Sequence, residues 1–150
     1  MNFDDLAKSY LSQAEERLEL ARIEYERRKY NITVRFCQEA VELALKASLR
    51  LVGVEVPKFH DVGPVLKVNA DRFPPWFKEK VDLYASYSRT LRREREPSMY
   101  GDEETGTPPE LLYSEYDGRE ALRMATEVVQ AVRKLLEEKE RSQRGDALRL

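Results

Sequence analysis

The chain has 150 residues, and its 26 basic and 28 acidic side chains leave a net charge of −2. This length supports one domain with its own core, and the balance of charges excludes a uniformly basic nucleic-acid coat protein but not a local basic patch. One cysteine and one histidine exclude a disulfide framework, a multi-cysteine zinc site and every motif with two histidines, so no metal and no cofactor is expected. No apolar run approaches the ~20 residues of a membrane span, and the acidic N-terminus is unlike a signal peptide, so we expect a cytoplasmic protein.

The apolar pattern is helical in the first third of the chain. Apolar residues recur every three or four positions over residues 3–25, which predicts a long amphipathic helix with charged outer faces. A second helix is predicted from about Ile32 to Val52, with Asn31 as its cap and Gly53 as its stop. The predicted buried stripe of the first helix is Leu6, Tyr10, Ala14, Leu18, Ala21 and Tyr25. The predicted buried stripe of the second is Phe36, Cys37, Ala40, Val41, Ala44, Leu45 and Leu49.

Two further helices are predicted in the middle of the chain. A short third helix begins after Asp61, which can cap it, and Val68 is among its expected inward residues. A fourth helix is predicted from about Pro75 until shortly before Pro97. Its expected buried face is Phe77, Val81, Tyr84, Ser88 and Leu91.

The last third begins with an irregular segment, residues 96–116, of a length that indicates either a functional loop or poor order. The spacing from Asp117 to Glu120 fits a capping box, so a fifth helix is predicted from there. Its expected inner face is Ala121, Leu122, Ala125, Val128, Val129, Val132 and Leu136. The sequence therefore predicts an all-α, up-and-down bundle of four to five helices over residues 1–136, followed by a frayed, charged tail over 137–150.

Four arginines gather near the end of the predicted fourth helix, and a tyrosine follows them. They are Arg89, Arg92, Arg93 and Arg95, with Tyr100 shortly after. The guanidinium fork binds phosphate and an aromatic ring stacks on a base, so this cluster is a candidate site for RNA or a nucleotide. The alternative interpretation is that the arginines have no ligand. They would then complement the negative end of the helix dipole and form ion pairs with Glu94, Glu96 and the glutamates at 103–104. The carboxylates at 102–104 suggest Mg²⁺ only weakly, because no further spaced ligands accompany them.

The order of these elements resembles that of a known family. The predicted second helix, from Tyr30 to Ala47, resembles the signature helix of HEPN domains. Gly53, Pro57 and the triplet at 60–62 are similar to the family's connector into its third helix. The segment 100–109, followed by an alanine-rich last helix, resembles a prokaryotic, mostly archaeal subgroup.

The resemblance covers roughly residues 6–136 and implies a four- to five-helix bundle, usually dimeric, that acts in nucleic-acid or nucleotide biology. Many members are metal-independent ribonucleases, often toxins of toxin–antitoxin pairs with a small nucleotidyltransferase. Their active site is an arginine followed four to six residues later by a histidine. The arginine stabilises the phosphorane charge while the histidine moves a proton.

This chain lacks a histidine at that spacing after any arginine of the cluster, and its only histidine, His60, lies far upstream. We therefore expect a non-catalytic HEPN-like homodimer that binds RNA, a nucleotide or a nucleotidyltransferase partner through the arginine cluster and Tyr100. One alternative is a degenerate ribonuclease in which Arg89 clamps phosphate and Tyr100 or Asp102 replaces the histidine. The other is a purely structural subunit. Apolar positions outside the predicted stripes support the homodimer: Phe3, Leu11, Leu20, Ile23, Trp76, Leu83 and Tyr87.

Overall fold

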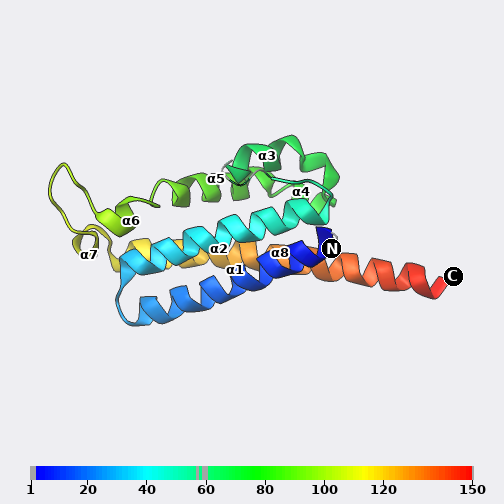
Figure 1. Cartoon of the computed structure of the whole chain (residues 1–150), viewed down its shortest axis with the longest axis horizontal. Coiled ribbons are helices and arrows are strands. Elements are labelled where there is room, and N and C mark those ends of the chain that lie inside the picture. The colour runs from blue at the N-terminus through cyan, green and yellow to red at the C-terminus, as the bar shows by residue number, and fades with distance from the viewer. Residues whose placement is uncertain (1–2, 57, 59–60, 150) are drawn as a thin grey trace.

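The computed structural model describes residues 3–56, 58 and 61–149, and within them it contains helices, turns and one isolated bridge. Two long helices, α1 (Phe3–Glu26) and α2 (Tyr30–Leu51), form an antiparallel hairpin, and the last helix, α8 (Glu115–Arg149), lies along both (Figure 1). The remaining elements are α3 (Val62–Val68), η1 (Ala70–Arg72), α4 (Pro75–Lys78), α5 (Val81–Arg92), α6 (Pro97–Tyr100) and α7 (Pro109–Leu112). The all-α bundle is thereby confirmed, and no helix in the described ranges is sufficiently long and apolar for a membrane span.

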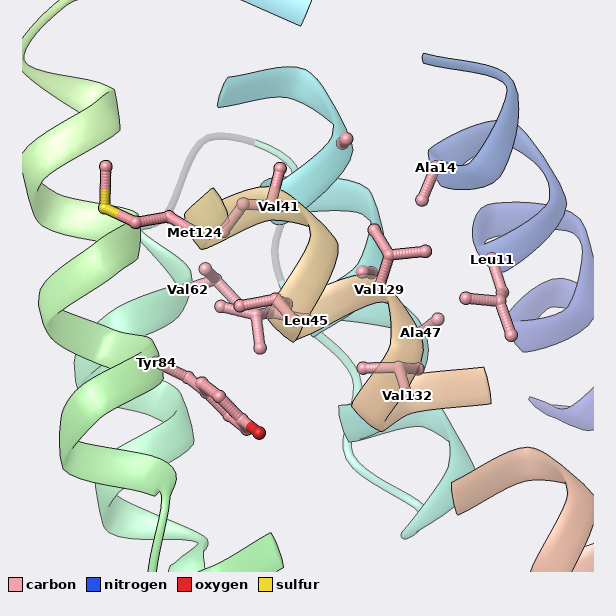
Figure 2. Packing of buried hydrophobic residues seen from close by; sticks show 14 of the residues in the cluster. Leu11, Ala14, Val41, Leu45, Ala47, Val62, Tyr84, Met124, Val129 and Val132 are labelled. Carbon is pink, nitrogen blue, oxygen red and sulfur yellow. The ribbon is translucent and has the colours of Figure 1, made fainter. Parts of the chain in front are cut away.

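The buried stripe of α1 differs from the predicted one at both ends. Leu6, Tyr10 and Tyr25 are only partly buried. Ala7 and Leu11 are in the core, so Leu11 is not available for the predicted dimer contact. The core positions are separated alternately by four and three residues, as expected of a helix that packs one face against neighbouring helices. They are Ala7, Leu11, Ala14, Leu18 and Ala21. Every second member is alanine, so the helices approach closely. Figure 2 shows Leu11 and Ala14 facing the side of the bundle that holds Ala47 of α2 and Val129 and Val132 of α8.

The predicted stripes of the other long helices are largely confirmed. Every predicted position of α2 is buried except Phe36, and every predicted position of α8 is buried except Leu122; both of these pack partly against the core. Cys37 lies in the core, and its burial raises the pKa of the thiol to about 12, so it acts as a small apolar side chain. Val68 is 84% exposed, so its predicted inward position is wrong.

The predicted fourth helix is divided in two. The turn at 79–80 separates α4 from α5, yet all five predicted face residues are buried. Phe77 of α4 is fully buried, and its ring centroid lies 4.5 Å from that of Phe73 and 5.5 Å from that of Tyr84. This aromatic cluster fastens the short α4 to α5.

Two helix starts differ from their predicted positions. Lys29 rather than Asn31 is the N-cap of α2, and the buried Asn31 amide donates a hydrogen bond to the Ser98 carbonyl, 3.2 Å away. The helix α8 begins one turn earlier than predicted. Ser114 forms the capping box with Asp117, whose carboxylate accepts from the Ser114 backbone N–H at 2.9 Å. Asp61 caps α3 as predicted and accepts from the Gly63 N–H at 3.1 Å.

The helix α8 also continues beyond its predicted end. The tail from residue 137 was expected to fray, whereas α8 is helical to Arg149 and extends past the bundle (Figure 1). Its next turns are tied to the other long helices: Lys139 Nζ lies 2.9 Å from Asp4 Oδ1 and 2.7 Å from the Leu51 carbonyl. The hydrogen bond from Lys139 holds the pKa of Asp4 below its usual value. Polar anchors thus support the helix where its apolar stripe has ended.

Candidate nucleic-acid interface

The end of α5 and the short α6 form one wall of a groove of ≈ 760 Å³, and α2 contributes to the other. Its lining residues are Arg35, Arg92, Arg93, Arg95, Glu96, Pro97, Met99 and Tyr100. Three of the four predicted arginines therefore meet around one concave surface with Tyr100. Arg89 is exposed on α5 but does not line this groove. Asp102 lines a different pocket.

The groove residue that sequence reasoning missed is Arg35, which comes from the second turn of α2. Its guanidinium donates a hydrogen bond to the backbone carbonyl of Arg95 and so fixes the turn between α5 and α6. The Asn31–Ser98 hydrogen bond, one helical turn earlier, fixes α6 itself. Asn31, Arg35, Glu39 and Glu42 recur at helical spacing, and this polar stripe on a largely apolar helix was the available signal.

The charges of the groove are only partly compensated. The Arg92 and Glu42 side chains approach to 3.4 Å, and Arg35 and Glu39 do the same along α2. Among the residues that the structure describes, no hydrogen bond or ion pair engages the guanidinium groups of Arg93 and Arg95. Both are exposed at the groove and therefore give it positive charge that an anionic ligand can neutralise.

The alternative in which the arginines pair with Glu94, Glu96 and the loop at 103–104 is not found in the described part of the chain, where Arg92 pairs with Glu42 of α2 instead. Glu94 instead accepts a hydrogen bond from the Tyr113 hydroxyl at 2.8 Å. Burial, followed by this carboxylate, raises the pKa of Tyr113 well above its usual value. Glu94 is thereby oriented toward the neighbouring pocket and away from the groove.

That neighbouring pocket, of ≈ 560 Å³, is acidic. It is lined by Glu94, Glu96, Pro97, Tyr100, Gly101, Asp102, Glu103, Glu104, Leu112, Tyr113 and Asp117. The Asp102 carboxylate accepts from the backbone N–H groups of Glu104, at 3.0 Å, and Thr105, at 3.3 Å, so it shapes the loop. No group of three potential metal ligands is found in the described ranges. Tyr100 alone of the predicted site residues lines both the groove and the acidic pocket.

The lone histidine, His60, and Pro57 of the predicted connector lie outside the described residues. The described site is therefore a groove of arginines with one exposed aromatic ring, bordered by an acidic loop. Such a groove can hold phosphates through its guanidinium groups and stack a base on Tyr100.

Comparison with known proteins agrees with this architecture. The crystal structure of TT1696 from Thermus thermophilus is similar over 93% of this chain and 99% of that chain, with 24% identity and a TM-score of 0.65, and so shares the fold. A comparison with curated proteins found no match. The model of the HEPN domain matches residues 7–135, nearly the whole bundle. The chain therefore belongs to the HEPN domain family.

Proposed function

We propose that this HEPN protein binds RNA in the arginine groove and does not cleave it. The observation that carries the proposal is the convergence of four arginines on one groove beside Tyr100, a residue that is 62% exposed. The arginines are Arg35, Arg92, Arg93 and Arg95. Guanidinium groups contact the phosphates of a single strand, and the tyrosine ring supplies a stacking surface. A free nucleotide would use the same contacts.

The non-catalytic part of the proposal rests on the missing histidine. No imidazole follows the arginines at the family's spacing, so the group that transfers the proton in the family's ribonucleases is missing. The ribonuclease alternative required Arg89, with Tyr100 or Asp102. Arg89 lies outside the groove lining, and Asp102 lines the acidic pocket instead. This separation supports a binding protein over a degenerate nuclease.

The double variant Arg92→Ala/Arg93→Ala should weaken binding of labelled single-stranded RNA by at least about tenfold, because two charge-assisted contacts are removed. Fluorescence anisotropy at several salt concentrations gives the slope of the logarithm of the binding constant against the logarithm of the salt concentration. The magnitude of this slope should fall by roughly 1.4 in the double variant, because two phosphate contacts are lost. The matched control is Arg141→Ala/Arg144→Ala, which removes the same charge from exposed positions of α8.

Three results would contradict the proposal. The first is that the wild-type protein binds no RNA. The second is that both double variants bind as tightly as the wild type; a lowered Tm of the groove variant would then favour a purely structural subunit. The third is chelator-resistant cleavage of the RNA that Arg89→Ala abolishes, which would establish the ribonuclease alternative.

We further propose a cytoplasmic homodimer, with the α6–α7 end as its contact surface. Met99, Leu111 and Leu112 are 49%, 78% and 37% exposed there, beside the groove. Sedimentation at micromolar concentration should give twice the chain mass of 17.6 kDa, and Leu111→Glu should shift the protein toward the monomer. A wild-type species of one chain mass would refute the dimer.

A small nucleotidyltransferase is the alternative partner at the α6–α7 end. An adjacent gene that encodes such an enzyme would favour this partner over a second copy of the chain.

A further inference from the structure

The opposite end of α2 carries a second basic pocket, which is separate from the arginine groove. Its volume is ≈ 400 Å³, and it is lined by Tyr10, Leu43, Lys46, Arg50, Glu55, Val56 and Lys58. Arg35 and Arg50 are fifteen residues apart on α2, which places the two sites about 22 Å from each other at 1.5 Å per residue. One small ligand therefore cannot occupy both.

Basic residues outnumber acidic ones among the described residues that line this pocket. Three are basic, Lys46, Arg50 and Lys58, and one is acidic, Glu55. Lys46 and Arg50 lie four residues apart on one helix face, a spacing at which like charges repel. An anion between them relieves that repulsion.

The geometry of Arg50 is suited to such an anion. Its side chain is only 13% exposed, and its guanidinium carbon lies 5.3 Å from the centroid of the Tyr10 ring, which holds the group in place. The Glu55 carboxylate oxygen Oε1 lies 3.9 Å from Arg50 Nη2, but the Glu55 side chain is 72% exposed. This ion pair is therefore weak, and the carboxylate is easily displaced into solvent. A positioned guanidinium and two ammonium groups thus border one cavity.

The walls between these charges are apolar. Leu43 and Val56 line the pocket beside the ring of Tyr10. The volume lies within the range of small-molecule sites, which are mostly apolar with a few convergent polar groups. We propose that this pocket binds a small phosphate monoester, with the phosphate between Lys46, Arg50 and Lys58 and its organic part against the apolar walls.

Titration of the full chain with inorganic phosphate and with phenyl phosphate, followed by amide NMR at constant ionic strength, tests this proposal. Both should shift amide signals over residues 43–56, and phenyl phosphate should bind more tightly because its ring covers the apolar wall. Lys46→Gln should weaken binding by about tenfold, because one charge-assisted contact is lost. Glu55→Gln should strengthen it about two- to fivefold, because the competing carboxylate is removed.

The controls are Lys67→Gln, the same charge change at an exposed position of α3, and Arg93→Gln, the same charge change in the arginine groove. Both should bind phosphate at the pocket as the wild type does. Unchanged affinity in Lys46→Gln, shifts that chloride alone reproduces, or shifts confined to the arginine groove would each overturn the proposal. Because the two sites are read out by different amides, its failure leaves the RNA proposal intact.

Discussion

Replacing Phe77 by alanine should lower the free energy of unfolding by about 3–5 kcal/mol, the largest effect expected of any single truncation in this core. The side chain is fully buried, and it contacts both Phe73, before α4, and Tyr84 of α5. Removing the ring takes away its own burial, leaves a cavity and detaches these neighbours from one another. A four-residue helix is not stable by itself, so α4 depends on such contacts. Without the Phe77 ring, its main remaining tie to another helix is the hydrogen bond from the Trp76 indole N–H to Glu138 of α8, at 2.9 Å.

Urea denaturation of the two proteins measures this loss as a lower midpoint with an unchanged slope. Phe36→Ala is the matched control, since it removes the same ring from a position that is only partly buried. It should cost about half as much. A loss below about 1 kcal/mol in Phe77→Ala would mean that the aromatic cluster rearranges to fill the space.

Replacing Gly101 by alanine should open the loop between α6 and α7. Gly101 has φ +75° and ψ −156°, a conformation that is almost restricted to glycine and costs other residues about 1–3 kcal/mol. A Cβ there would also lie 2.1 Å from the backbone carbonyl oxygen of Thr107, a clash that no side-chain rotation relieves. The backbone must therefore move, and the paired hydrogen bonds between Asp102 and Thr107 should break.

Hydrogen exchange at the amides of Asp102 and Thr107 reports this opening directly, and both should lose their protection in Gly101→Ala. RNA affinity should fall as well, because Tyr100 directly precedes the displaced glycine. Gly106→Ala is the control: its φ is also positive, at +72°, but a Cβ there would meet nothing within 4 Å. Equal protection in the two variants would show that the clash at Gly101 is absorbed elsewhere.

The sequence was most informative where one apolar stripe has no competitor. On α8 the spacing of three and four residues leaves a single apolar face, and the buried positions follow it. The central α2 also buries all but one of its predicted positions, but its contacts with several other helices bury polar residues outside that stripe as well, among them Thr33, Gln38 and Ser48. On α1, the pairs Leu6–Ala7 and Tyr10–Leu11 offer two adjacent stripes. Periodicity does not choose between them. Close approach to the alanine-rich α2 favours the stripe with the smaller residues, which is a property of the packed bundle.

The candidate site, too, was predictable where its residues are close in sequence and not where packing brings distant residues together. The arginines on α5 and in the following turn are close in sequence, and Arg92, Arg93 and Arg95 meet in one groove with Tyr100. Arg35 belongs to the same groove from a distant helix, and only the packing of α6 against α2 brings it there. Local spacing also suggested pairing with Glu94, but the Tyr113 hydroxyl, nineteen residues later, binds that carboxylate.

The helix that runs along both α1 and α2 is the last one in the chain, and this order affects the protein while it is being made. The α1–α2 hairpin leaves the ribosome early, but the face that α8 covers, including Ala47, stays open until the residues around Val132 have emerged. Domains usually fold as units, and apolar surface exposed on the way promotes aggregation. The nascent hairpin should therefore expose apolar surface until α8 emerges, and a chain terminated before α8 should be insoluble.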